Sequence, residues 1–322
     1  MRKNMFKKIS ELFILIFIFS SCTTKKQTIS ENVIRLPLPT EIKGFDPAYA
    51  EDLYSHTLMA QIYETLMQYS YLERPYKVEP LLAEEMPEIS SDGLTYTFKI
   101  KKGVYFQKDP CFKEKRELTA YDFVYSFKRI ADIKTRSTGW WIFDKRILGL
   151  NEFREKTKKE EKIDYEKIDV PGLKALDKYT LQIKLTQPYP QFLYVLTMMY
   201  TAAVPKEAVE YYGDEFLNHP VGTGPYKLTK WVRNSIIVLE KNPDFREEYY
   251  PTKGEPEDEK LGLLKDAGKK IPFIDKVEFH IFLEDQPMWL NFLKGNIDRS
   301  GIPKDNYSSA ITPTKELVPE LK

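Results

Sequence analysis

The chain has 322 residues, with 49 Lys and Arg residues against 48 Asp and Glu residues. General nucleic-acid binding needs a clustered excess of basic residues, so this near-neutral balance argues against such a partner. The length is sufficient to bury a large hydrophobic core, in one large domain or two smaller ones.

The N-terminus predicts an export signal followed by a lipid attachment site. Four cationic residues in MRKNMFKK precede an apolar run, Leu12–Phe19, and two serines then precede Cys22. The run is too short to cross about 30 Å of hydrocarbon at about 1.5 Å per residue, and the layout is typical of a cleaved signal. Small residues before a cysteine resemble the lipobox of bacterial lipoproteins. We therefore expect a signal peptide at 1–21 and a polar, lipidated tether at 22–32; the alternative is an ordinary secretory signal with an incidental cysteine.

Helix and strand patterns alternate along the rest of the chain, without an internal repeat. Apolar residues three or four apart predict helices at Ser55–Tyr69 and Leu118–Ile130, and Thr119 with Asp122 forms a capping box at the start of the second. Alternation with a period of two predicts half-buried strands, as follows: Thr95–Phe106, Tyr179–Leu185 and Lys276–Phe282. The pattern indicates a mixed α/β fold.

No constellation for catalysis or metal binding is visible. The three histidines lie far apart without metal-ligand spacing, and no serine lies in a G-x-S-x-G elbow. Apart from Cys22 the only cysteine is Cys111, and a lone cysteine without a visible partner is more often inert than reactive. We therefore expect no enzyme activity, no metal and no cofactor.

The stretch HPVGTGPYKLTKW, residues 219–231, contains two glycines and a lysine but does not fit a phosphate-binding loop. Such a loop needs G-x-x-x-x-G-K-[ST] between a strand and a helix. Here Gly222 and Gly224 are two apart, Pro225 follows, and the next residues alternate as a strand does. The proline disfavours a helical conformation for the residue before it. We expect the glycines to serve a close backbone crossing that leads into a strand.

These segments together resemble a known family. HPVGTGPYKLTKW looks like the signature crossing of the extracellular solute-binding proteins of ABC importers, the oligopeptide- and dipeptide-binding family (family 5). Other landmarks occur in the family's order: FDPAYAEDLYSHTLMAQIYETLM, DGLTYTFKIKKGVYF with ELTAYDFVYSFKRIAD, ALDKYTLQIKLTQPYPQFLYVL with AVPKEAVEYYG, and KVEFHIFLEDQPMWLNFLKGNIDRSGIPKDNY. The resemblance covers about residues 33–310.

The resemblance implies an α/β, two-lobed periplasmic-binding-protein-like fold with an extra subdomain in lobe one. It places lobe one at 33–70 and 187–280, its subdomain at 71–186, and the start of lobe two at 281–322. Because family members usually continue well beyond this point, we expect the second lobe to be incomplete and the chain to be a fragment or a truncated product.

The same resemblance implies which residues face the ligand. Carried over by position, the loop after Asp46-Pro47 would face the cleft, and its candidate ligand-binding residues are Tyr49, Glu51, Asp52 and Leu53. For Glu51, a role as a loop carboxylate or helix-cap partner remains nearly as plausible. Trp140 and Trp141 are adjacent, so we expect one of them in the core and the other at the wall of the cleft.

The expected function is that of an exported substrate-binding lipoprotein in the periplasm or on the cell surface. Its expected partners are a peptide or small solute, the ABC permease subunits, and the membrane through lipid on Cys22. Two other functions stay open: a surface lipoprotein with a binding or adhesion role and no transport activity, and a secreted hydrolase.

Overall fold

The computed structural model describes residues 32–159 and 163–321. The predicted signal peptide and Cys22 lie outside these residues. None of the helices in the described ranges combines the length and hydropathy that crossing a bilayer requires.

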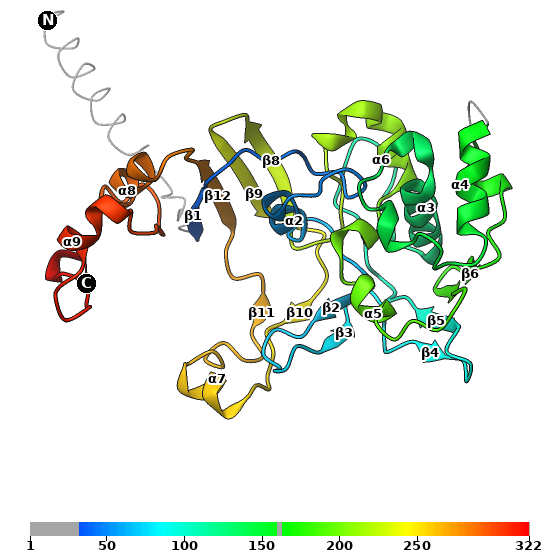
Figure 1. Cartoon of the computed structure of the whole chain (residues 1–322), viewed down its shortest axis with the longest axis horizontal. Coiled ribbons are helices and arrows are strands. Elements are labelled where there is room, and N and C mark those ends of the chain that lie inside the picture. The colour runs from blue at the N-terminus through cyan, green and yellow to red at the C-terminus, as the bar shows by residue number, and fades with distance from the viewer. Residues whose placement is uncertain (1–31, 160–162, 322) are drawn as a thin grey trace, which may run out of the picture. The chain divides into compact units, whose positions relative to one another are not determined.

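The first sheet joins the start of the described chain to three strands from residues 226–281. Its strands are β1 (Val33–Leu38), β12 (Lys276–Ile281), β9 (Ile236–Lys241) and β8 (Tyr226–Val232), in the order β1-β12-β9-β8 (Figure 1). β1 runs parallel to β12, with Val33 opposite Lys276, and the other two pairs are antiparallel. The strand predicted at Lys276–Phe282 is thereby confirmed.

The second sheet is antiparallel throughout. Its order is β4-β5-β7-β6, with β4 at Glu88–Ile89, β5 at Thr95–Lys99, β7 at Thr180–Lys184 and β6 at Leu173–Asp177. The strand predicted at Tyr179–Leu185 is confirmed. The one predicted at Thr95–Phe106 is shorter than expected, because the chain turns at Gly103, whose φ is 70°.

The remaining elements are short helices and hairpin strands. They are α2 (Leu53–Met59), β2 (Met67–Tyr69), β3 (Val78–Pro80), α3 (Ala120–Ala131), α4 (Leu150–Lys159), α5 (Phe192–Val195), α6 (Lys206–Tyr212), β10 (Glu248–Tyr249), α7 (Pro256–Lys260), β11 (Lys270–Ile271), α8 (Asp285–Leu293) and α9 (Tyr307–Ala310), with 3-10 turns at Ile133–Thr135, Trp140–Ile142, Tyr165–Lys167, Met199–Thr201, Gly213–Leu217, Lys304–Asn306 and Pro319–Leu321.

Helix α3 confirms its sequence signals. The carboxylate of Asp122 accepts hydrogen bonds from the backbone N–H of Thr119 at 2.7 Å and from its hydroxyl at 2.9 Å. Phe123, Phe127 and Ile130, which share the predicted apolar face, are buried. Local capping and periodicity are therefore enough to predict this helix from the sequence.

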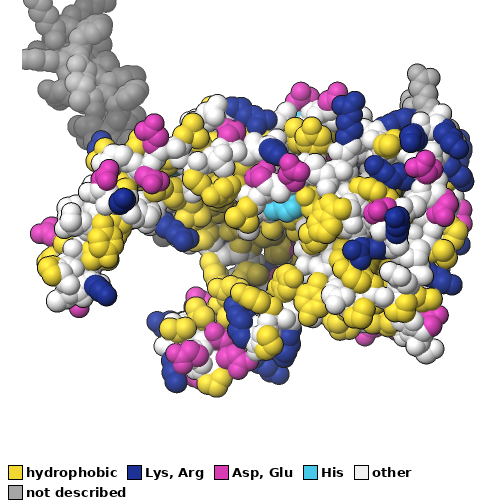
Figure 2. Space-filling view, viewed as in Figure 1, with side chains coloured by type: hydrophobic (Ala, Val, Ile, Leu, Met, Phe, Trp, Pro, Cys, Tyr) yellow, Lys and Arg dark blue, Asp and Glu magenta, His cyan; other side chains and the backbone are white. Residues whose placement is uncertain are grey.

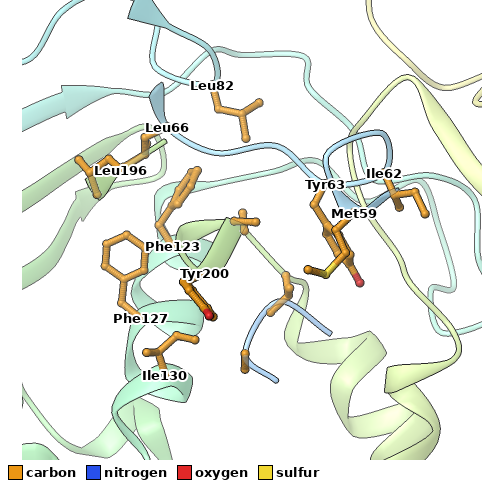
Figure 3. Close-up of a cluster of buried hydrophobic side chains, with 14 of the residues drawn as sticks. Met59, Ile62, Tyr63, Leu66, Leu82, Phe123, Phe127, Ile130, Leu196 and Tyr200 are labelled. Carbon is orange, nitrogen blue, oxygen red and sulfur yellow. The ribbon is translucent and has the colours of Figure 1, made fainter. Parts of the chain in front are cut away.

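A single cluster of buried side chains includes residues from both sheets and from α2 and α3. Figure 3 shows part of it, where residues distant in sequence converge. They come from the end of α2 and the residues that follow it, from α3 and from the chain after α5: Met59, Ile62, Tyr63, Leu66, Phe123, Phe127, Ile130, Leu196 and Tyr200. Burial of this size is the main favourable term in folding.

The helix predicted at Ser55–Tyr69 is wrong over most of its length. Helix α2 ends at Met59, and the chain then turns and enters β2 at Met67. Leu58, Ile62 and Leu66 are buried as the pattern required, whereas Tyr69 is exposed. The carbonyls of Gln61 and Ile62 accept hydrogen bonds from a distant segment. Tertiary contacts thus override the local helix preference.

That distant segment is the glycine crossing. The N–H of Gly224 donates to the carbonyl of Ile62 at 2.8 Å, and the N–H of Tyr226, the first residue of β8, donates to that of Gln61 at 2.9 Å. A Cβ atom on Gly222 would lie 1.9 Å from the carbonyl oxygen of Ile62. Neither glycine has a positive φ, so the lack of a side chain is what the crossing requires. The sequence-based interpretation is confirmed.

Candidate functional site

The turn that begins at Asp46 organises the candidate ligand-binding loop. The backbone N–H groups of Tyr49 and Ala50 both donate to the carbonyl of Asp46, each at 3.0 Å. The side chain of Asp46 accepts a further hydrogen bond from the N–H of Ala48 at 2.9 Å. Such side-chain-to-backbone bonds stabilise a compact turn, so the loop is held in one conformation by its own first residue.

Arg129, from α3, donates hydrogen bonds to both oxygens of the Asp46 carboxylate. Its Nη1 and Nη2 donate to Oδ1 and Oδ2 at 2.7 and 2.6 Å, and the two side chains are only 12% and 9% exposed. Burial alone would lower the pKa of Arg129, but the charge and hydrogen bonds of Asp46 raise it above its ordinary value. The two side chains form a bidentate pair that anchors the loop to α3.

The end of the loop is fixed by the start of α2. Asp52 is the N-cap, and its Oδ1 accepts from the N–H of Ser55 at 2.8 Å. Partial burial raises the pKa of Asp52, but the hydrogen bonds from Ser55 outweigh it and leave the pKa below its usual value. His56 Nε2 lies 2.8 Å from the carbonyl oxygen of Ala50. Asp52 thus serves as a helix cap in this structure.

Glu51 is paired with Lys43 at 2.6 Å, and both side chains are about half exposed. The hydrogen bond from Lys43 to Glu51 raises the pKa of the lysine. An exposed pair of this kind contributes little to stability because water screens it. The loop-carboxylate role that the sequence left open for Glu51 is therefore present, and the pair remains accessible to a ligand.

Three apolar side chains project from this region. Tyr49 is 46% exposed, Leu53 73% and Trp141 56%. The adjacent Trp140 instead packs against the core, with the guanidinium of Arg154 4.7 Å from its ring centre. Of the two tryptophans, Trp141 is thus the one available to a ligand.

The segment before the tryptophans is joined to the loop by hydrogen bonds. The N–H of Thr138 donates to the carbonyl of Ala48 at 3.1 Å, and its hydroxyl donates to that of Tyr49 at 3.2 Å. Next to it, a Cβ atom on Gly139 would clash with the ring of Tyr200. The structure therefore brings the 46–53 loop and the 138–141 segment together, although almost ninety residues separate them.

Sequence reasoning missed the residues that support this site. A cavity of about 600 Å³ is lined by Asp46, Tyr49 and Arg129 together with Tyr125 and Tyr165. Burial raises the pKa of Tyr125 to about 12, so its phenol is neutral. Asp46 and Tyr49 belong to the predicted loop, whereas Tyr125, Arg129 and Tyr165 come from two distant segments and carry no motif that would mark them.

Hydrophobic side chains also gather at a second place on the surface. Figure 2 shows them around a hollow between the positions at which Figure 1 labels α2 and β10. Three exposed tyrosines form a connected aromatic surface: Tyr69 lies 6.0 Å, ring centre to ring centre, from both Tyr76 and Tyr194. Exposed aromatic clusters of this kind are common at binding surfaces. Among the described residues, no group of three or more His, Cys, Asp or Glu side chains is placed to hold a metal ion.

Two comparisons with known proteins point to the same family. A model of bacterial extracellular solute-binding proteins, family 5 Middle, matches residues 77–319. The periplasmic oligopeptide-binding protein OppA of Escherichia coli K12 is 30% identical over 224 residues, which is 69% of this chain and 37% of OppA. Both the family and this relative are described as binding proteins.

Solved structures share the fold. OppA of Listeria monocytogenes bound to peptide has a TM-score of 0.68 at 20% identity, covering 87% of this chain and 48% of that one. A periplasmic oligopeptide-binding protein from Borrelia burgdorferi has a TM-score of 0.68 at 24% identity, and the match covers 87% of this chain and 49% of that one. The expected fold class, that of the two-lobed periplasmic binding proteins, is thus confirmed. The chain spans about half the length of these structures and little more than a third of E. coli OppA.

Proposed function

Because the chain belongs to family 5 of the bacterial extracellular solute-binding proteins, we propose that it captures peptides or related solutes and delivers them to the permease of an ABC importer. The observation that carries this proposal is the pre-organised loop at 46–53. Buried and paired groups hold its backbone, while Tyr49, Leu53 and Trp141 project outward. A rigid loop with projecting apolar side chains binds a ligand without a further ordering cost.

The proposed binding mode uses the main chain of an extended peptide. In such complexes, main-chain hydrogen bonds provide affinity, and roomy, hydrated pockets accept varied side chains. The aromatic rings of Tyr49 and Trp141 supply contact area at low entropic cost. Glu51, whose ion pair with Lys43 is exposed, accepts a hydrogen bond from an ammonium group or an N–H group of the ligand. Asp52 contributes mainly by capping α2.

We assign residues 33–70 and 187–280 to lobe one, 71–186 to its subdomain and 281–322 to the start of lobe two. This division puts all four strands of the first sheet in lobe one, apart from the last residue of β12, and all four strands of the second sheet in the subdomain. In a two-lobed protein, ligand that bridges both lobes favours the closed form by population shift.

The affinity for peptides tests the site directly. Calorimetric titration of the mature protein with a mixture of short peptides is expected to show saturable binding. Trp141→Ala and Tyr49→Ala are each expected to weaken it about tenfold, equivalent to about 1.4 kcal/mol. Tyr121→Ala, which removes an equally exposed aromatic side chain from α3, is the matched control. Absence of binding at millimolar peptide by a cooperatively folded protein would refute the proposal.

We further propose that the protein is exported and attached to a membrane by lipid on Cys22. Intact-mass measurement of protein extracted from its own membranes is expected to show a chain that begins at Cys22 and carries fatty-acyl mass. Cys22→Ser is expected to release the protein into the soluble fraction. A chain that begins elsewhere, with Cys22 unmodified, would contradict this.

A further inference from the structure

Both segments of the candidate functional site, at 46–53 and 138–141, are supported by one buried side chain, that of Tyr200. Tyr200 lies in the 3-10 turn at Met199–Thr201 and is 6% exposed. The next residue, Thr201, is fully buried, and its hydroxyl donates to the carbonyl of Met198 at 2.9 Å. The turn is therefore fixed in the core, and Figure 3 shows Tyr200 among the side chains of the buried cluster.

The ring of Tyr200 contacts the backbone just before the tryptophans. A Cβ atom on Gly139 would lie 2.3 Å from Cδ1 of that ring and 2.6 Å from its Cγ. The backbone of Gly139 has φ −90° and ψ 0°, which other residues also adopt in turns, so the ring is what requires a glycine here. The carbonyl of Gly139 accepts from the N–H of Ile142 at 3.1 Å and so begins the turn that carries Trp141. The place of the ring therefore sets where this turn begins.

A second contact joins Tyr200 to α2. The ring of His56 lies 4.9 Å, centre to centre, from the ring of Tyr200, and the two planes meet at 79°. Such an edge-to-face arrangement is favourable for aromatic rings. The Nε2 of His56 lies 2.8 Å from the carbonyl oxygen of Ala50, which belongs to the loop at 46–53. Tyr200 thus supports the loop through His56, as it supports the turn of Trp141 through Gly139.

The direct hydrogen bonds between the two segments are a weaker constraint than this ring. Thr138 donates to the carbonyls of Ala48 and Tyr49 at 3.1 and 3.2 Å, and the second of these bonds is exposed. A hydrogen bond open to water contributes little net stability, because water can replace either partner. Protein interiors are close-packed, so a buried ring in contact with both segments cannot shift without losing those contacts.

From these contacts we propose that Tyr200 is a positioning residue for peptide binding, whose ring sets the spacing between the 46–53 loop and the turn that carries Trp141. The inference rests on the proposed function, since it concerns how the same site is kept ready for its ligand. A site whose contact residues are already held in place binds without a further ordering cost. The hydroxyl of Tyr200 makes no hydrogen bond with another residue in the described part of the chain, so the ring alone serves this role.

Two substitutions of Tyr200 in the mature protein test this role by calorimetric titration with the peptide mixture. Tyr200→Leu removes the ring and is expected to weaken peptide binding about tenfold. Tyr200→Phe keeps the ring and is expected to keep the affinity within about twofold of the wild-type value. Phe98→Leu is the control for loss of a buried ring, because Phe98 is fully buried on β5 of the second sheet. It is expected to lower stability and to leave the peptide affinity unchanged.

Hydrogen exchange detected by NMR, without peptide, gives a second measurement. The N–H of Thr138 bonds to the loop, so its exchange rate reports whether the two segments stay together. This rate is expected to be about tenfold higher in Tyr200→Leu than in Phe98→Leu, and unchanged in Tyr200→Phe. The proposal is overturned if Tyr200→Leu and Phe98→Leu agree in peptide affinity or in exchange at Thr138. If the wild-type protein binds no peptide, the proposed function is refuted, and the exchange rates alone decide whether Tyr200 sets the spacing.

Discussion

Replacing Gly222 by alanine is expected to lower the free energy of unfolding by about 3 kcal/mol or more, or to prevent folding. The added methyl group would lie 1.9 Å from the carbonyl oxygen of Ile62, which is backbone and cannot move aside alone. If the glycine segment moved away from Ile62, the hydrogen bond from the N–H of Gly224 to that carbonyl would break, and the first residue of β8 would shift. Urea denaturation followed by tryptophan fluorescence measures the loss.

Gly301→Ala is the matched control for this prediction. No atom lies within 4 Å of the position that its Cβ would take, and its φ is not positive. We expect the free energy of unfolding of this variant to lie within about 0.5 kcal/mol of that of the wild-type protein. If Gly222→Ala matched Gly301→Ala in stability, the close crossing described above would be incorrect.

Replacing Arg129 by methionine is expected to cost about 3–5 kcal/mol of stability. The substitution leaves the carboxylate of Asp46 without its two guanidinium bonds, in a position that is only 7% exposed. An unpaired buried charge is the costly product of breaking such a pair. Because the same carboxylate holds the turn at Ala48, the loop at 46–53 is also expected to loosen and peptide affinity to fall.

A double variant separates the charge effect from the loss of packing. Arg129→Met/Asp46→Asn removes the unpaired charge and keeps an oxygen that can accept from Ala48, so it is expected to be more stable than Arg129→Met by about 1–2 kcal/mol. Arg136→Met, at an exposed arginine of the neighbouring turn, is expected to change stability by less than about 0.5 kcal/mol. Equal stability of the single and double variants would show that the charge of Asp46 is not buried as described.

Elements with purely local signals could be predicted from the sequence. The capping box at Thr119 and the apolar face of Phe123 and Phe127 predict α3, and alternation predicts the strands at Thr180–Lys184 and Lys276–Ile281. In each, the capping or alternation that gives the signal lies among neighbouring residues, although the two strands take their hydrogen-bond partners from distant strands. The helix predicted at Ser55–Tyr69 failed because the carbonyls after Met59 bond to the glycine crossing instead.

By itself, the sequence determined the positions of the loop after Asp46, of the crossing at Gly222–Pro225 and of α3, because proline, glycine and capping residues restrict the backbone locally. Only the tertiary structure decided what those segments meet. The bond between Asp46 and Arg129 joins residues 83 positions apart, and Gln107 bonds to Pro220 across 113 positions. No local pattern encodes such pairs, because each depends on how the whole core brings distant segments together.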